Sequence, residues 1–463
     1  MTAALQPTAA SAARPAPVSF WQAFAFWLKL GFVSFGGPAG QIAIMHSELV
    51  ERRRWISERR FLHALNYCMV LPGPEAQQLA TYIGWLMHRS WGGVVAGALF
   101  VLPSLFILIA LSWLYIAFGD LPLVAGLFYG IKPAVTAIVM QAAHRIGSRA
   151  LKDPLLWLIA AASFVAIFAG NVPFPAIVLA AALLGHVGGR LAPQRFQTGG
   201  GHGRAAASAG PALIDDDTPT PAHARFRWRG LAAVVGVGAA LWLAPMALLC
   251  GLYGWQGPLT QMAWFFTKAA LLTFGGAYAV LPYVYQGAVA HYGWLSATQM
   301  IDGLALGETT PGPLIMVVAF VAFVGGYQSA ALQAALLAQL GWSGPGALFG
   351  AGALAACVAT WFTFLPSFLF ILAGGPLVEA THGELKLTAP LTAITAAVVG
   401  VILNLALFFG YHVLWPTGFG GRFDAVSAAI ALAAGIALLR FKRPVMHVIA
   451  ACALAGLLSQ LLR

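Results

Sequence analysis

Long apolar runs, interrupted at a few places by glycine and proline, make up most of this 463-residue chain. A helix needs about 20 apolar residues to cross a hydrocarbon core of about 30 Å. Four spans are expected near 92–118, 122–146, 154–170 and 172–192, and a linking span near 231–254. The pattern predicts an all-α, polytopic membrane protein.

Four of the apolar runs are broken in two recurring ways. Phe-Gly-Gly occurs at 35–37 and 274–276, and Pro-Gly-Pro occurs at 72–74 and 311–313. Proline removes a helix hydrogen bond and glycine admits unusual backbone angles, so each break ends one half-helix and begins another. Broken backbone at membrane depth is tolerated only where protein or water satisfies its polar groups.

The breaks belong to a sequence repeat. Lys268 follows Lys29 by 239 residues (268 − 29), and the same offset maps Trp55 onto Trp294 and each break of the first copy onto its counterpart. Such duplication is typical of secondary transporters. The expected domains are a disordered tail (1–19), a first repeat (20–192), a flexible polar linker (193–229), a linking span (230–256) and a second repeat (257–463).

Loop charge predicts that the two repeats are inverted. The loop after the first Phe-Gly-Gly is rich in arginine, whereas its counterpart, 291–300, has no Lys or Arg. Positive loops stay in the cytoplasm. We therefore expect re-entrant segments at 20–46 and 61–88, a cytoplasmic N-terminus and linker, and a C-terminus on the periplasmic side of a bacterial inner membrane. These arginines are topology anchors or, alternatively, a funnel for anions; they are Arg52, Arg53, Arg54, Arg59 and Arg60.

The breaks predict an anion site. A half-helix N-terminus presents free N–H groups and partial positive charge. In an inverted repeat the four tips should meet near the midplane. The alternative is that the breaks are structural kinks. The candidate substrate-binding positions are Gly36, Gly37, Pro38, Pro72, Gly73, Pro74, Gly275, Gly276, Pro311, Gly312 and Pro313.

Two lysines add charge to the candidate site. Lys29 and Lys268 lie at equivalent depths, about ten residues or 15 Å into their segments. A lysine inside a membrane is costly and usually functional, so we predict that both bind substrate. The alternative is that they extend to the membrane surface. Lys132 has no counterpart at a fixed offset, and the same alternative applies to it.

Two carboxylates flank the Pro-Gly-Pro breaks without being repeat equivalents. Glu75 follows the first break and Glu308 precedes the second. A carboxylate repels a dianion unless it is protonated, so we hypothesise that at least one couples proton movement to anion movement. Glu75 can instead simply stabilise a helix N-terminus. Asp302 is expected near the outer end of its helix. The predicted polar liners, for which interhelical hydrogen bonds are the alternative role, are Gln41, Asn66, Gln77 and Gln78.

Composition excludes several other classes. Only 8% of the residues are charged, against about 25% in soluble domains, so lipid is the expected solvent. The net charge of +11 is concentrated in loops and does not indicate nucleic acid. The four cysteines are isolated and the histidines lack metal-ligand spacing, so no metal or cofactor is expected. No HExxH or clustered Asp motif indicates an enzyme. A channel remains the alternative to a carrier, and a homodimer stays open.

The sequence resembles the chromate ion transporter family, whose long-chain members carry two homologous halves. The similar stretches are FVSFGGPAGQIAIMH, LPGPEAQQLATYIGW and FVLPSLFIL in the first half, and TFGGAYAVLPYV and GETTPGPLIMVVAFVAFVGGY in the second. The family's motif positions fall on the glycines and prolines of the four breaks and on Glu75. One departure is Ala277, which stands where the first Phe-Gly-Gly is followed by Pro38.

The resemblance implies a carrier that exports chromate from the cytoplasm and confers chromate resistance, driven by the proton gradient or the membrane potential. Sulfate is a related tetrahedral oxyanion. A carrier of sulfate or another oxyanion, working inward, is the alternative. The residues themselves predict an anion carrier; chromate comes from the resemblance alone.

Overall fold

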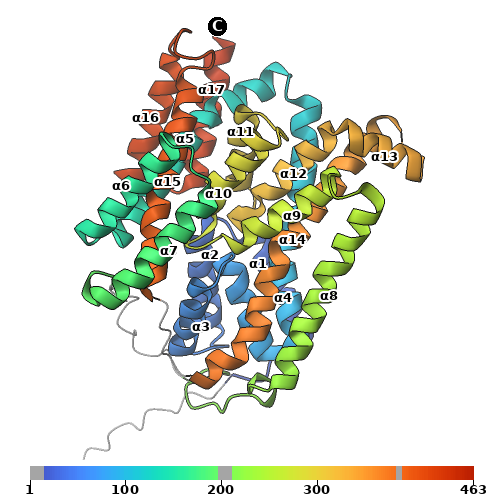
Figure 1. The fold of residues 1–463 in the computed structure, drawn as a ribbon, viewed down its shortest axis with the longest axis vertical. Helices are drawn as coiled ribbons and strands as arrows, with labels where there is room; N and C mark the ends of the chain where they lie inside the picture. Colours follow the sequence, from blue (N-terminus) through green and yellow to red (C-terminus); the bar gives the residue numbers. More distant parts are fainter. Residues whose placement is uncertain (1–14, 197–210, 342, 382–387, 463) are drawn as a thin grey trace, which may run out of the picture.

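The computed structural model describes residues 15–196, 211–341, 343–381 and 388–462. Most of the expected tail and residues 197–210 of the linker lie outside this part of the chain. The described residues are almost entirely helical, with one isolated β-bridge (Figure 1). Six helices are long and apolar enough to cross a membrane, or seven if one bent pair counts as a single span. The all-α, polytopic membrane class is therefore confirmed.

The two repeats contain corresponding helices. The first has α1 (Phe20–Val33), α2 (Gly37–His46), α3 (Glu58–Val70), α4 (Glu75–Phe118), α5 (Pro122–Ala150), α6 (Pro154–Phe168) and α7 (Phe174–Leu191). After α8 (Trp228–Tyr253) the second has α9 (Pro258–Leu271), α10 (Ala277–Tyr285), α11 (Ala297–Thr309), α12 (Val317–Gln328), α13 (Ala330–Leu340), α14 (Gly344–Thr381), α15 (Thr388–Leu414), α16 (Ala425–Leu439) and α17 (Val445–Leu461).

The repeat extends to local backbone detail where the sequences differ. A π-helical turn follows α2 at Ser47–Arg52, and another follows α10 at Gln286–His291, at the same offset of 239. Ser57 caps α3 by accepting a hydrogen bond from the Arg60 amide, and Ser296 caps α11 in the same way. A serine at this position satisfies an N–H group that the helix leaves unpaired.

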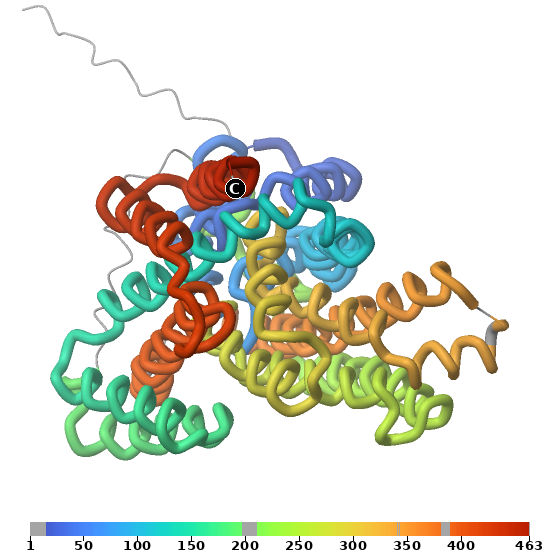
Figure 2. The backbone as a smooth tube through the Cα atoms, turned by 90° about the horizontal axis from the view of Figure 1, so that it is seen from above, coloured from blue at the N-terminus to red at the C-terminus, as the bar shows by residue number. Residues whose placement is uncertain are grey.

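The two repeats interleave in a reciprocal arrangement. Helix α5 packs against α16 and α17, and its counterpart α15 packs against α6 and α7 (Figure 2). Glycine allows these close approaches: Gly130 of α5 faces Gly456 of α17, and Gly400 of α15 faces Ala160 of α6. In Figure 1, α3 lies near the lower end of the long axis and its counterpart α11 near the upper end. This is the placement that an inverted repeat requires.

Helix α4 contains a reversal of the chain. At His88 and Arg89 the backbone leaves helical geometry, with φ/ψ of −135/36° and 57/−161°. The segments on either side pack on each other, since Gly84 faces Gly92 and Ala96. The chain thus runs along α3, turns at Pro-Gly-Pro, follows the first part of α4 to residue 88 and reverses there. A re-entrant segment at 61–88 is expected to follow this path. In the second repeat, α12 and α13 meet at a 72° bend, and α13 occupies the sequence insertion.

The linker is not free along its whole length. Leu213 and Ile214 donate backbone hydrogen bonds to Arg54 and Trp55, and Ser57 donates to Ile214. The side chain of Ile214 is buried, as is that of Ala224. Apolar side chains and this short β-bridge therefore attach part of residues 211–229 to the first repeat, and the flexibility of the linker stays a prediction.

Candidate functional site

The four helix breaks meet through two reciprocal backbone hydrogen bonds. The amide of Gly73 donates to the carbonyl of Thr273 at 2.8 Å, and the amide of Gly312 donates to the carbonyl of Ser34, also at 2.8 Å. Thr273 and Ser34 immediately precede the two Phe-Gly-Gly sequences. Each Pro-Gly-Pro turn is thus attached to the Phe-Gly-Gly break of the other repeat, so the four breaks form two pairs across the repeats.

The Pro-Gly-Pro turns need glycine and are tightly packed. Gly73 and Gly312 have φ of 131° and 101°, a region that residues with a Cβ rarely adopt. A Cβ on Gly73 would also clash with the hydroxyl of Ser367, and one on Gly312 would clash with Ser104. These serines belong to the repeated Leu-Pro-Ser sequence. The turns therefore form the rigid part of the site, and the prolines Pro74, Pro311 and Pro313 are buried while Pro72 is half-buried.

The Phe-Gly-Gly breaks border open space instead. Gly36 and Gly275 are exposed, and a Cβ on Gly37 or Gly276 would meet no atom within 4 Å. Pro38 is half-buried in the first turn of α2. Neither α2 nor α10 has a side-chain cap at its N-terminus. Pro38 has no N–H and the Ala279 amide donates to the Gly276 carbonyl, so the first amides available to an anion are those of Gly37 and Ala277.

Glu308 is buried in the last turn of α11 and has a partner from the second Phe-Gly-Gly break. The hydroxyl of Tyr278, in the first turn of α10, donates a hydrogen bond to its Oε1. Glu75, the first residue of α4, is half-buried and makes no side-chain hydrogen bond within the described part of the chain. The two carboxylates thus have different surroundings, although each lies beside a Pro-Gly-Pro turn.

Arg145 is a member of this group that sequence reasoning missed. It lies in α5, half-buried, and its positive charge acts on Glu75, Glu308 and Tyr278. It lies at the end of the expected span near 122–146, and the observed helix α5 continues beyond that span to Ala150. The signal was available: Ala142, Ala143, Gly147 and Ala150 are all buried, at the spacing of one helix face.

Three of the four predicted polar liners are buried at the breaks. The Gln41 amide donates to the carbonyls of Ser34 and Gly312, and Gln78 donates to the carbonyl of Pro72 at 2.8 Å. Gln77 donates to Thr81 at 3.0 Å. Gln41 and Gln78 thus hold the turns in place, the role that the alternative of structural hydrogen bonds describes, whereas the Gln77 bond lies within α4. Asn66 is exposed on α3 and is not brought to them.

The same side chains leave buried polar atoms unpaired. No described protein group bonds to the Oε1 atoms of these three glutamines or to the hydroxyls of Ser34 and Ser367. A buried polar atom normally has a partner, in protein or water. This local excess of unpaired groups is typical of a cavity that holds water or a polar solute.

Among the described residues, the side chains of Lys29 and Lys268 make no hydrogen bond or ion pair with the breaks. Lys29 is exposed on α1, on the side away from the buried Phe26, Trp27 and Leu30. Lys268 is half-buried, and its Nζ lies 5.5 Å from the ring centroid of Trp264. The placement of Lys29 favours the alternative that its amine extends to the membrane surface. Substrate binding by either lysine stays a prediction.

Several of the loop arginines have partners near the linker. Arg52 and Arg53 pair with Glu48 at 2.6 and 3.3 Å, and Arg60 pairs with Glu379 at 3.1 Å. Burial by itself raises the pKa of Glu48, but the hydrogen bonds and charges of the two arginines outweigh burial and hold this pKa below its usual value. These arginines have structural roles, which favours anchoring over an open funnel.

The described residues hold no group of three or more His, Cys, Asp or Glu side chains arranged to bind a metal. Cys68 and Cys452 are buried, Cys250 is half-buried and Cys357 is exposed, and all four are free thiols. The arrangement at the breaks is therefore one of backbone amides, amide and hydroxyl side chains, one arginine and two carboxylates.

Comparison with known proteins gives a consistent result. The family model for the chromate transporter matches residues 21–186 and 260–457. The chain is 35% identical to a chromate transport protein of Pseudomonas aeruginosa over 85% of this chain and 82% of that protein. It is 30% identical to a chromate transport protein of Cupriavidus metallidurans over 98% of this chain and 96% of that protein. A probable chromate transport protein of Synechococcus elongatus is 28% identical over 83% of each. No solved structure matches.

Proposed function

The chain belongs to the chromate transporter family, and we propose that it is a secondary carrier that exports chromate from the cytoplasm. The transport of chromate is what the family supports. Export, its energy source and the resulting chromate resistance are our proposal.

The observation that carries this proposal is the convergence of the four breaks. Chromate is a tetrahedral dianion, whose four oxygens accept hydrogen bonds from several directions at once. The uncapped N-termini of α2 and α10 offer donors from both repeats, next to the open space at Gly37 and Gly276. Charge-assisted hydrogen bonds of backbone amides to oxyanions are among the stronger ones that proteins make.

Proton coupling is assigned to the two carboxylates. A dianion at the breaks is repelled by Glu75 and Glu308 when both are ionised. Protonation of one of them removes this repulsion, so that anion binding and proton uptake are linked. We assign the larger share to Glu308, because it precedes its break and gains no stabilisation from a helix N-terminus. The Tyr278 hydroxyl holds the Glu308 carboxylate in place.

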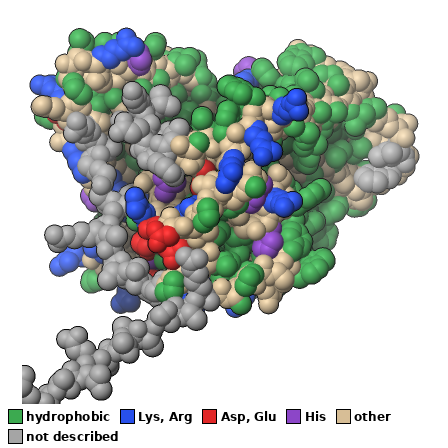
Figure 3. Space-filling view, turned by 90° about the horizontal axis from the view of Figure 1, so that it is seen from below, with side chains coloured by type: hydrophobic (Ala, Val, Ile, Leu, Met, Phe, Trp, Pro, Cys, Tyr) green, Lys and Arg blue, Asp and Glu red, His purple; other side chains and the backbone are tan. Residues whose placement is uncertain are grey.

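The direction of transport rests on orientation. Lys and Arg side chains are spread over the end that carries α3 and the linker, around one acidic patch (Figure 3). We infer that this end faces the cytoplasm. The C-terminal end of α17 lies at the opposite end of the molecule (Figure 1).

Reporters fused after Arg463 and inserted near Gly210 should therefore report opposite sides of the membrane. Equal sides would contradict the orientation.

The function is tested in inverted membrane vesicles, whose outer face is the cytoplasmic one. Export then appears as uptake of chromate, and we expect saturation, competition by sulfate and counterflow. Flux that rises linearly with concentration would favour a channel. Uptake of sulfate by right-side-out vesicles without chromate uptake by inverted ones would favour the alternative of an inward sulfate carrier.

A further inference from the structure

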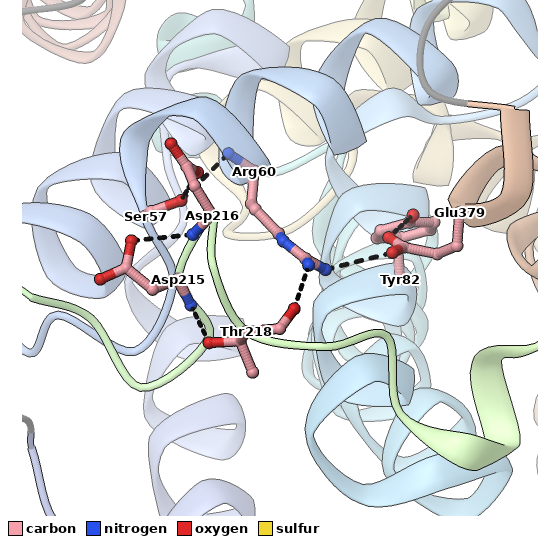
Figure 4. A network of polar contacts seen from close by, with 7 residues as sticks. All are labelled: Ser57, Arg60, Tyr82, Asp215, Asp216, Thr218 and Glu379. Carbon is pink, nitrogen blue, oxygen red and sulfur yellow. Dashed lines mark hydrogen bonds and ion pairs between the residues drawn. The ribbon is translucent and has the colours of Figure 1, made fainter.

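A polar latch joins the two repeats at the linker end. Arg60 of α3 pairs with Glu379 of α14 at 3.1 Å, and the Tyr82 hydroxyl donates to the other carboxylate oxygen of Glu379 at 2.5 Å (Figure 4). The side chains of Arg60 and Glu379 are only 14% and 5% exposed. Arg60 also donates to the carbonyl of Thr218 at 2.7 Å, so the linker closes over the pair.

A second polar latch lies at the other end. Asp302 of α11 accepts a hydrogen bond from the Tyr115 hydroxyl of α4 at 2.8 Å, and Lys132 of α5 lies 3.4 Å from the same carboxylate oxygen. Asp302 is 3% exposed, and its Oδ1 has no partner among the described residues. A buried carboxylate that keeps one oxygen unpaired is costly, which is unusual for a purely structural contact.

The two latches occupy corresponding places in the inverted repeat. Each joins the helix before a Pro-Gly-Pro turn to the long helix of the opposite repeat: α3 to α14, and α11 to α4. The offset of 239 places Arg60 at 299, one turn from Asp302. The offset between Ser104 and Ser367 is 263, which places Tyr115 at 378, next to Glu379. The residues differ, but equivalent helices are joined at equivalent positions.

Each latch is mechanically connected to the breaks. Helix α3 leads from Arg60 to the turn at Gly73, and Ser367 of α14 packs against that same glycine. Helix α11 leads from Asp302 to the turn at Gly312, which packs against Ser104 of α4. Parting either pair of helices would therefore open a path from one end of the molecule to the breaks.

A cavity already reaches the linker-side latch. It has a volume of about 450 Å³ and is lined by Thr220, Ala224, Arg225, Phe226, Glu379 and Ala380. Space beside Glu379 lets its carboxylate move away from Arg60 without displacing packed side chains.

We propose that these two latches are the alternating gates of transport. The Arg60–Glu379–Tyr82 latch closes the linker side, and the Lys132–Asp302–Tyr115 latch closes the opposite side. Each contains a cation, which an approaching dianion attracts in competition with the carboxylate. Both latches are closed in this structure. The proposal rests on the carrier function but not on the identity of the anion.

The test measures from which side the breaks can be reached. Ala39, exposed in α2 beside the first Phe-Gly-Gly, is replaced by cysteine in a chain whose four native cysteines are serine. A membrane-impermeant maleimide is applied to vesicles of either orientation. Glu379→Gln should raise the ratio of linker-side to opposite-side labelling about tenfold. Asp302→Asn should lower it by a similar factor, and the two together should return it toward the starting value.

Milder and compensating variants keep the test decisive. Tyr82→Phe and Tyr115→Phe each remove a single hydrogen bond and should shift the ratio in the same two directions, by less. Exchanging the charges, with Arg60→Glu and Glu379→Arg, should restore the original ratio. Equal ratios in all variants, or shifts toward the same side from both ends, would overturn the proposal. Labelling requires no chromate, so a failure of chromate transport alone leaves this result interpretable.

Discussion

The two copies of the break differ in side chains far more than in backbone. Both Pro-Gly-Pro turns donate a 2.8 Å hydrogen bond to the residue before the opposite Phe-Gly-Gly, and both Phe-Gly-Gly turns have glycines at positive φ. Several polar side chains, however, have an apolar residue at the equivalent position of the other repeat. The unlike pairs at the offset of 239 are Ala39 with Tyr278, Gln41 with Val280, Met69 with Glu308 and Glu75 with Leu314.

This contrast indicates a division of labour. The symmetric backbone supplies amides and rigid turns, so it serves both directions of access equally. The asymmetric side chains place the carboxylates and their partners, so they serve coupling. Variants that alter the backbone should therefore have matching effects in the two copies, and variants that alter side chains should not.

The largest effects are expected from the turn glycines. Gly73→Ala and Gly312→Ala each introduce a Cβ at positive φ, which alone costs about 1–2 kcal/mol, and each adds a steric clash. Both should lose nearly all transport and lower the melting temperature to a similar extent. Gly230→Ala is the matched control, because its Cβ would meet nothing within 4 Å. A severe loss in one copy with near-normal transport in the other would break the symmetry that we describe.

The next largest effect concerns coupling, where the copies should differ. Glu308→Gln should still exchange chromate at equal pH but lose its acceleration by a pH gradient. Glu75→Gln should lose less of this acceleration. Tyr278→Phe should weaken the response, whereas Tyr283→Phe in the same helix serves as a control. If both glutamine variants keep the full response in vesicles, these carboxylates are structural and coupling lies elsewhere.

Arg145 gives a smaller effect that is specific to substrate. Its charge acts on both carboxylates, so Arg145→Gln leaves them less compensated and should raise KM for chromate about tenfold, or about 1.4 kcal/mol. Arg149→Gln, one turn further along and exposed, should leave KM unchanged. A similar KM shift in both variants would point to a general effect of surface charge.

The smallest effects are expected from the lysines. If both held the dianion, Lys29→Ala and Lys268→Ala would raise KM steeply and equally. Lys29 is exposed, so we expect its variant to stay within about twofold of the parent, while Lys268→Ala has the larger effect of the two. Initial rates over a range of chromate concentrations separate these outcomes, and a steep rise for Lys29→Ala would return it to the site.

The sequence predicts the architecture well because glycine and proline mark the repeat and its breaks, and the backbone effects of these residues are local. The convergence of the breaks and the burial of Gln41, Gln77 and Gln78 follow the same reasoning. What sequence patterns do not resolve is three-dimensional pairing. The Tyr278–Glu308 contact joins residues 30 positions apart, and the Arg60–Glu379 pair joins residues 319 positions apart.

Charge is the least reliable guide in this sequence. The expected span ends near 146, beside Arg145, yet α5 continues to Ala150, because its buried alanines and glycine keep one helix face apolar. A lysine at membrane depth predicts a site, yet Lys29 lies on the exposed side of α1. A polar, Gly- and Ala-rich linker predicts flexibility, yet Ile214 and Ala224 within it are buried. In each case tertiary packing decides.

The central claim is that chromate binds where the four breaks meet. A cryo-EM map of the protein in lipid nanodiscs, with and without chromate, tests it most directly. We expect added density within hydrogen-bond distance of the first amides of α2 or α10, beside Gly37 and Gly276. That density should be absent from Gly312→Ala if this variant folds. Chromate density beside Lys268, or elsewhere away from the breaks, would contradict the account.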